Sequence, residues 1–352
     1  MKKIKEYDIL KIMAIILVVL SHSAYYKISS NYGGMDYQQY LNSHSAFTLY
    51  KILGKFMEII YYFHMPLFMA ISGVFFSIQI KKDRWNKIEK LLTSKFKRLM
   101  LPFFVFTLLY SLPLKYISNY YNGVSFWRAI TGQFLLLGNS HLWYLYALFI
   151  IFIISFYCLR RNTSIFVYLS LYIIHVLSFL IHITLVSAPL QFLFWFSMGF
   201  LFESKRRKYN IFLENHKWIS LLFFMLFIFL VVLNFLFKSD FKVLSRFFVD
   251  LLAILGSLIC YNISYFLSNK TKILDSKLLN LILINGLGIY IFSDTLNYFI
   301  LSISYFVSDR FMFTSFGIII IFLIRFFFTL FLGLVFTLLF KKVFPKYSWL
   351  VN

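Results

Sequence analysis

The chain has 352 residues, of which 61% are hydrophobic and 22% aromatic, and its mean hydropathy is +0.79. Soluble domains are only about half apolar, so this composition excludes an ordinary soluble protein and predicts an integral membrane protein. The net charge of +22 does not indicate nucleic-acid binding, because the basic residues form short clusters between apolar spans.

Apolar windows of about 20 residues, the length that crosses a bilayer as a helix, predict about ten transmembrane helices. In chain order we expect them at residues 8–26, 57–79, 101–118, 141–159, 163–182, 188–203, 217–237, 246–267, 279–302 and 314–340. The predicted fold class is therefore an all-α, polytopic membrane helix bundle. We expect a single domain over residues 1–352 and no soluble domain.

The basic clusters orient the predicted helices. They lie at residues 2–5, 81–98, 160–161, 205–217, 270–277 and 341–346. All of them fall on one side when the N-terminus is cytoplasmic, as the positive-inside rule requires. We therefore expect both termini in the cytoplasm. The outer segment 27–56 is interpreted as a disordered loop, and the alternative is a cover over a site.

The first predicted helix carries two costly polar residues, Lys11 and His22. At roughly 100° and 1.5 Å per residue, they lie on the same face about 16 Å apart. Imidazole is the usual general base at neutral pH, so His22 is the candidate for taking a proton from a hydroxyl. The alternatives are a structural hydrogen bond for His22 and a surface pair between Lys11 and Asp8.

A second constellation begins at Phe63 and His64 in the second predicted helix. Pro66 removes a backbone donor there, and Gly73 permits close approach of another helix, which favours a bend around a cavity. His64 is expected at a depth similar to that of His22. The alternative is an interfacial histidine.

The third constellation is a basic run, Lys95, Lys97 and Arg98, which leads through Pro102 into the third predicted helix. Lysine and arginine at a membrane surface bind phosphates, and arginine does so with two hydrogen bonds. The alternative is that the run anchors the helix to lipid headgroups.

Weaker signals lie further along the chain. His141 and Trp143 open the fourth predicted helix on the outer side, where tryptophan is also typical of the interfacial belt. Asp294 lies in the outer half of the ninth. A buried carboxylate needs a partner, and an imidazole from the first helix would serve. Glu58 is the alternative carboxylate for orienting His22.

Together these motifs resemble the membrane acyltransferase family 3, whose members move acetyl or succinyl groups onto sugar hydroxyls. The family's first helix carries a basic residue and a histidine at the spacing of Lys11 and His22. Residues 63–73 resemble the second-helix signature of its polysaccharide-modifying branch. Residues 97–102 resemble its basic segment before the third helix, and residues 141–144 the opening of its fourth.

Two positions depart from the family pattern. Many relatives have arginine where this chain has Lys11, and lysine keeps the charge but loses the bidentate hydrogen bonds. Near the C-terminal end many relatives have a histidine three residues after a tyrosine. Here Ser293 follows Tyr290 at that spacing, and Asp294 comes next.

The resemblance implies a multi-pass acyltransferase of the bacterial plasma membrane. It would transfer an acyl group from cytosolic acyl-CoA, foremost acetyl-CoA, to a hydroxyl of a cell-surface or lipid-linked polysaccharide. We expect direct transfer, with an acyl-enzyme as the alternative. Expected roles are catalysis for His22 and Asp294, CoA binding for Lys11, Lys95, Lys97 and Arg98, and substrate binding for His64, His141 and Trp143.

The expected partners are the lipid bilayer, the glycan or lipid-linked sugar acceptor and the polysaccharide synthesis machinery. No metal and no nucleic acid is expected. The rival hypothesis is a transporter or polysaccharide export subunit without chemistry, which ten helices with polar midplane groups would also suit. The absence of a visible internal duplication in the sequence disfavours it. A third hypothesis is a scaffold subunit of a glycan synthase.

Overall fold

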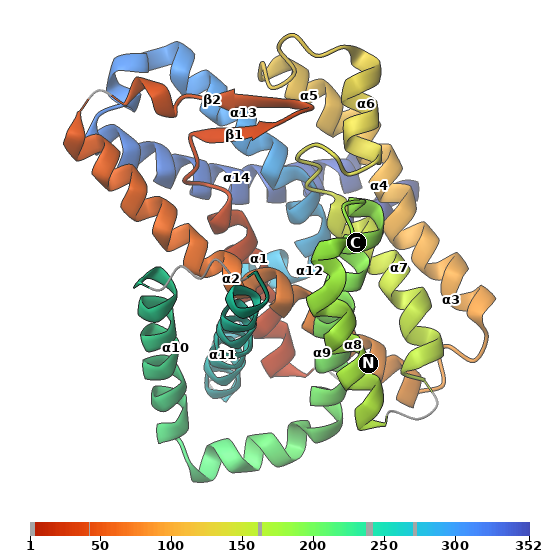
Figure 1. The fold of residues 1–352 in the computed structure, drawn as a ribbon. Coiled ribbons are helices and arrows are strands. Elements are labelled where there is room, and N and C mark those ends of the chain that lie inside the picture. Colours follow the sequence, from red (N-terminus) through yellow and green to blue (C-terminus); the bar gives the residue numbers. More distant parts are fainter. Residues whose placement is uncertain (1–3, 42, 161–163, 237–241, 270–272) are drawn as a thin grey trace. The chain divides into compact units, whose positions relative to one another are not determined.

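The computed structural model describes residues 4–41, 43–160, 164–236, 242–269 and 273–352 (Figure 1). Five residues of the basic clusters lie outside this range, namely Lys2, Lys3, Arg161, Lys270 and Lys272. Within the described residues the fold is helical apart from one short hairpin, which confirms the helical class.

The α-helices are α1 (Lys5–Ser21), α2 (His44–Lys81), α3 (Ile88–Lys95), α4 (Leu101–Phe106), α5 (Leu112–Ile117), α6 (Phe126–Phe134), α7 (Trp143–Cys158), α8 (Ile165–Leu177), α9 (Thr184–Asn215), α10 (Trp218–Leu236), α11 (Lys242–Ser268), α12 (Lys277–Ile284), α13 (Gly286–Met312) and α14 (Ser315–Val343). The strands are β1 (Lys27–Ser30) and β2 (Gly33–Asp36). Two π-helical turns are η2 (Phe96–Met100) and η3 (Thr107–Ser111). The short 3-10 helices are η1 (Gln38–Tyr40), η4 (Ser178–Leu180) and η6 (Pro345–Val351).

Seven helices of the described chain are long and apolar enough to cross a membrane. They are His44–Lys81, Ile88–Ile117, Thr184–Asn215, Trp218–Leu236, Leu244–Ser268, Gly286–Met312 and Ser315–Val343. Trp143–Cys158 and Ile165–Leu180 are apolar but shorter. These helices make a multi-pass membrane protein, while the total of about ten spans and the cytoplasmic placement of both termini stay predictions.

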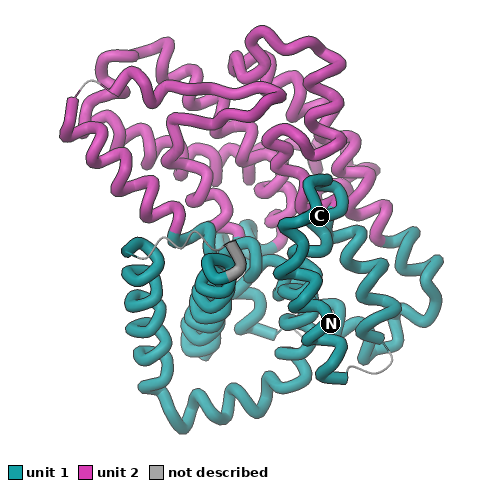
Figure 2. Tube along the Cα trace, viewed as in Figure 1, with its two compact units in different colours: residues 1–14, 59–94, 147–283 teal, residues 15–58, 95–146, 284–352 magenta. Residues whose placement is uncertain are grey.

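The chain divides into two compact units, drawn in different colours in Figure 2. Unit 1 comprises residues 1–14, 59–94 and 147–283, and unit 2 comprises residues 15–58, 95–146 and 284–352. Each unit is assembled from three separate segments of the chain.

Unit 1 depends on a close crossing of α2 and α9. A Cβ on Gly73 would lie 1.9 Å from the carbonyl oxygen of Phe196, and a Cβ on Gly199 would lie 1.9 Å from that of Ala70. Each helix therefore presents a glycine to the backbone of the other, a contact typical of small-residue interfaces between membrane helices. Further contacts pair α8 with α9 and α10 with α11.

Unit 2 is organised around the packing of α13 against α14. A Cβ on Gly288 would lie 2.3 Å from the hydroxyl oxygen of Thr337, so only glycine allows this approach. The break between α12 and α13 falls at Asn285, whose side-chain oxygen accepts a hydrogen bond from Lys341 at 2.8 Å. The single span predicted at 279–302 is thus two helices.

The predicted disordered loop at residues 27–56 is wrong. β1 and β2 pair antiparallel there, with Lys27 opposite Asp36. The backbone N–H of Gly34 donates to the carbonyl of Tyr120 at 2.8 Å, which ties the hairpin to the segment after α5. Met35 of β2 is buried in the same cluster as Tyr120. The alternative interpretation, that the segment covers a site, stays a prediction.

The second helix begins well before the predicted residue 57. The hydroxyl of Ser43 accepts a hydrogen bond from the backbone N–H of Ala46 at 3.1 Å, and α2 starts at His44. A serine hydroxyl that satisfies an N–H of the first turn is the usual helix N-cap. The prediction missed this part of the helix because it relied on apolar windows and the stretch contains polar residues.

The third helix also begins earlier than the predicted residue 101. Residues 88–117 are helical throughout, with η2 and η3 inserted as wide turns. Each wide turn precedes a proline, Pro102 or Pro113. Proline lacks an N–H and crowds the carbonyl four residues earlier, and a π-turn accommodates both effects.

We predict that Gly73→Ala destabilises the protein while Gly54→Ala does not. The new methyl group at Gly73 would force α2 and α9 apart, at a cost of about 1–3 kcal/mol in the free energy of unfolding. A Cβ on Gly54, in the same helix, meets no atom within 4 Å. Thermal unfolding of the purified variants in detergent measures both effects, and equal melting temperatures would contradict the close crossing.

Candidate active site

The candidate site begins where α1 ends. The sequence predicted a helix through residue 26, but α1 stops at Ser21, and His22 is the first residue beyond it. The hydroxyls of Ser21 and Ser23 donate to the carbonyls of Val18 and Val19, both at 2.8 Å. Serine hydroxyls that bond to preceding carbonyls compete with helix continuation.

Arg325 of α14 fixes the backbone of this turn. Its guanidinium donates to the carbonyl of Tyr25 at 2.7 Å, to the carbonyl of His22 at 3.2 Å and to the side-chain oxygen of Asn297 at 3.0 Å. The Arg325 side chain is fully buried. The planar guanidinium has donors in a fixed arrangement, so these contacts hold the chain that carries the His22 imidazole.

The carboxylate of Asp294 lies between two imidazoles. Its Oδ1 is 3.4 Å from Nδ1 of His22, and its Oδ2 is 3.5 Å from Nδ1 of His141. The side chains of Asp294 and His141 are 7% and 5% exposed, whereas that of His22 is 32% exposed. Only His22 in this trio therefore offers a large part of its ring to a ligand.

His141 is held by the helix that carries Asp294. Its Nε2 lies 2.9 Å from the carbonyl oxygen of Ile291, and the hydroxyl of Tyr290 donates to the backbone carbonyl of His141. A carbonyl only accepts, so Nε2 carries the proton. Nδ1 then faces the carboxylate of Asp294. A hydrogen bond between them requires a proton either on Nδ1 or on the carboxyl group.

Lys115 of α5 adds a buried cation close to the same carboxylate. Its side chain is fully buried and donates to the carbonyl of Asn139 and to the side-chain oxygen of Gln133. The ammonium lies 4.7 Å from the ring centre of Tyr120 and 5.2 Å from that of Tyr298. Aromatic faces and carbonyls stabilise a buried cation, so Lys115 contributes positive charge beside Asp294.

The wide turn η3 packs directly against α13 at the level of Asp294. The hydroxyl of Tyr110 donates to the carbonyl of Phe292 at 2.8 Å, and the hydroxyls of Ser111 and Thr295 lie 3.1 Å apart. π-turns occur often at functional sites. Here the turn directs two polar side chains at the backbone and side chains that flank Asp294.

The trio has the geometry of an oriented general base. A carboxylate that accepts a hydrogen bond from the Nδ1–H of His22 selects the tautomer whose Nε2 carries the lone pair. That nitrogen can take a proton from a hydroxyl, and the carboxylate stabilises the imidazolium that forms. Asp294 is thus the carboxylate next to His22, while Glu58, the alternative, forms an ion pair with Lys55 at 2.9 Å.

The predicted phosphate-binding residues fall within the long third helix. Lys95 ends α3 and is 8% exposed, whereas Lys97 and Arg98 lie in η2 and are exposed. The sequence interpretation placed them before the helix, because it started the span at an apolar window. All three belong to unit 2, as do His22 and Asp294.

Trp143 opens α7 and is half-buried, with its ring centre 6.4 Å from that of Tyr144. Tyr144 in turn packs edge-on against Tyr290 at 5.6 Å. This chain of rings connects the start of α7 to the helix of Asp294.

Lys11 and His64 belong to unit 1. The ammonium of Lys11 donates to the carbonyl of Leu283 at 3.1 Å. His64 is 1% exposed, and its Nδ1 lies 3.0 Å from the carbonyl of Ile60 one turn earlier. His64 is therefore a buried residue of α2 and not an exposed interfacial one, and its role in substrate binding stays a prediction.

Arg325 and Lys115 were missed in the sequence. Arg325 lies inside the apolar stretch 317–340, and an ionisable residue at such a position is a functional hypothesis by default. Lys115 lies near the end of the predicted span 101–118, where lysines commonly extend to the interface and carry no functional signal. Its burial depends on residues after α5 that no local pattern indicates.

Comparison with known proteins identifies the chain. A family model described as an acyltransferase domain matches residues 4–341. The chain belongs to the membrane acyltransferase family 3. It is therefore an acyltransferase, and the match spans both units. Searches of curated proteins and of solved structures found no significant match.

We predict that Asp294→Asn lowers the rate of acyl transfer about 10²- to 10⁴-fold, because an amide neither selects the His22 tautomer nor stabilises its imidazolium. Asp309→Asn is the matched control, since Asp309 is an exposed carboxylate in the same helix, α13. The two rates are compared in proteoliposomes with equal amounts of folded protein. A normal rate for Asp294→Asn would contradict the oriented-base geometry.

Proposed function

We propose that this acyltransferase moves an acyl group, acetyl in the first instance and succinyl as the alternative, from cytosolic acyl-CoA to a hydroxyl of a cell-surface or lipid-linked polysaccharide. The observation that carries the proposal is the pairing of a partly exposed His22 with the buried carboxylate of Asp294. A base so oriented is what an alcohol nucleophile needs at neutral pH.

The reaction proceeds in one transfer. His22 takes the proton of the acceptor hydroxyl as its oxygen attacks the thioester carbonyl carbon. The carbon–sulfur bond then breaks, and the proton passes from His22 to the departing thiolate, which leaves as free CoA. Holding both substrates in one place supplies much of the rate, because oriented reactants behave as an intramolecular pair.

Loop charge and exposure support a cytosolic donor. Lys97 and Arg98 are exposed and lie in a cluster assigned to the cytoplasmic side by the positive-inside rule. Such cations bind the phosphates of CoA, and Arg98 binds them bidentately. Lys95 and Lys11 are proposed as further contacts.

The acceptor hydroxyl is proposed to approach near the β1–β2 hairpin. Met35 of the hairpin packs with Tyr120, Tyr121 and Tyr298, and Tyr298 lies about one turn after Asp294 on α13. Aromatic residues suit the apolar faces of sugar rings, and the half-buried Trp143 is proposed to contact the acceptor. The buried His141 is proposed to act on the substrate through Asp294. The polysaccharide synthesis machinery is the proposed source of the acceptor, and the proposed location is the bacterial plasma membrane.

A direct test follows the fate of the donor. The purified protein in proteoliposomes is given acetyl-CoA labelled in the acetyl group, with and without a surface polysaccharide from its source. We expect free CoA and labelled polysaccharide to form in equal amounts, and only when both substrates are present.

The outcomes distinguish this proposal from its rivals. Translocation of polysaccharide without CoA release would favour the export hypothesis. Transfer from succinyl-CoA but not from acetyl-CoA would replace the donor and keep the mechanism. A labelled acyl group that stays covalently bound to the protein when no acceptor is present would favour an acyl-enzyme.

A further inference from the structure

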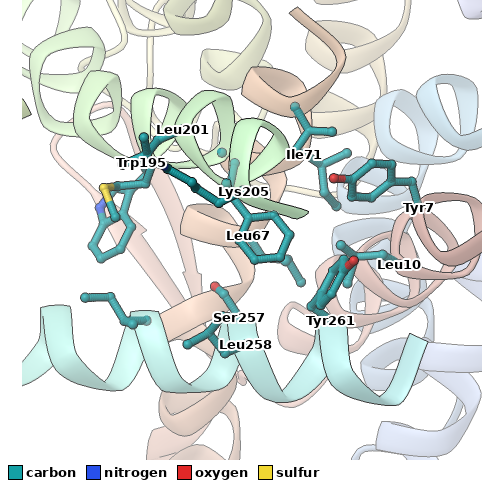
Figure 3. Close-up of a pocket in the computed structure, with 16 residues that line it drawn as sticks. Tyr7, Leu10, Leu67, Ile71, Trp195, Leu201, Lys205, Ser257, Leu258 and Tyr261 are labelled. Carbon is teal, nitrogen blue, oxygen red and sulfur yellow. The ribbon is translucent and has the colours of Figure 1, made fainter. Parts of the chain in front are cut away.

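Unit 1 contains an apolar cavity of about 290 Å³, shown in Figure 3. Its walls come from α1, α2, α9 and α11. Most of the lining is aliphatic or aromatic, including Leu67, Ile71, Trp195 and Leu258. The hydroxyls of two lining tyrosines bond elsewhere: that of Tyr7 to Glu203 at 2.5 Å and that of Tyr261 to Asn210 at 2.7 Å. The Ser257 hydroxyl is the exception, because it lines the cavity without a hydrogen-bond partner among the described residues. The rest of the interior offers contacts suited to a hydrocarbon ligand and unsuited to a sugar or a nucleotide.

The cavity accommodates the greater part of one lipid chain but not the whole of it. Trp195 and Lys205 both line it and lie ten residues apart on α9, which is about 15 Å along a helix axis. One leaflet of a bilayer has a hydrocarbon thickness of about 15 Å, half of the roughly 30 Å core. The volume is about twice the ~150 Å³ that holds a benzene ring, enough for about ten to twelve carbon atoms.

One end of the cavity opens at a positively charged surface. Lys205 lines the cavity and is exposed, so the cavity reaches the surface beside it. Residues 203–208 contain four cations and one carboxylate. They follow directly after the apolar part of α9, where the headgroups of a bilayer lie.

The two carboxylates near this opening, Glu6 and Glu203, are outnumbered by the four cations of residues 205–208. Arg206 pairs with Glu6 at 2.5 Å and with Glu203 at 3.0 Å. Lys205 and the two exposed cations that follow Arg206 therefore determine the sign of the local field. A ligand with an apolar tail and a negative head is complementary to this arrangement of interior and opening.

We propose that this cavity binds one hydrocarbon chain of an anionic membrane phospholipid, whose phosphate contacts Lys205. The lipid occupies a site in unit 1 that is separate from the residues of the candidate active site in unit 2. Its binding does not depend on the acyl-transfer reaction, so the two proposals fail independently.

The test uses the full chain in nanodiscs that contain phosphatidylglycerol with a photoreactive group at the end of one acyl chain. Phosphatidylcholine with the same chain is the comparison lipid. After illumination, mass spectrometry locates the cross-linked residues. We expect phosphatidylglycerol to label residues that line the cavity, such as Leu67 and Leu258, and phosphatidylcholine to label them less.

Two matched charge reversals test the headgroup contact. Lys205→Glu is expected to lower labelling of the cavity by phosphatidylglycerol about fivefold to tenfold, because reversal of one charge removes an attraction and adds a repulsion. Lys208→Glu changes the charge of the same exposed stretch but does not line the cavity. It is expected to leave the labelling unchanged.

A third variant fills the cavity. Leu258→Trp is expected to lower labelling by both lipids, with gel filtration as the check on folding; if it does not fold, the two charge reversals decide.

Labels confined to lipid-facing residues, or equal losses in Lys205→Glu and Lys208→Glu, would overturn the proposal. Displacement of the label by long-chain acyl-CoA at equimolar concentration would overturn it in favour of a donor-chain site, and competition by inorganic phosphate alone would overturn the requirement for a lipid.

Discussion

The buried carboxylate of Asp294 is the constraint on which unit 2 depends. An isolated charge in an apolar interior is prohibitively costly, so the surrounding groups have to compensate it. His22 and His141 lie at its two oxygens, and Lys115 adds a cation. Removing one partner would leave charge uncompensated, and this requirement keeps the ends of α1, α5 and α7 close to α13.

The same constraint explains why His22 lies outside a regular helix. A histidine within α1 would move only with that helix, whereas His22 belongs to a turn whose carbonyl oxygens bind Arg325 of α14. The guanidinium thus fixes the backbone and Asp294 fixes the ring. Fixed geometry in the resting protein is what makes a general base effective, because little reorganisation is needed during reaction.

The sequence predicted long apolar helices well, and it suggested that Asp294 meets an imidazole from the first helix. α10, α11 and α14 begin and end within a few residues of their predicted limits, because a continuous apolar run marks the extent of a membrane-spanning helix. It failed where polar residues form structure: the β1–β2 hairpin, the start of α2 and the π-turns before Pro102 and Pro113. Arg325 and Lys115 were missed because their partners lie far away in the chain.

The most direct test of the account is the rate of acyl transfer by His22→Ala with and without added imidazole. Since the His22 ring is 32% exposed, its removal leaves a space that opens toward the ligand side. If His22 is the base, the variant, correctly inserted and folded, loses activity and imidazole restores part of it, while Asp294→Asn is not rescued. An undiminished rate for His22→Ala without imidazole would contradict the assignment of His22 as the base.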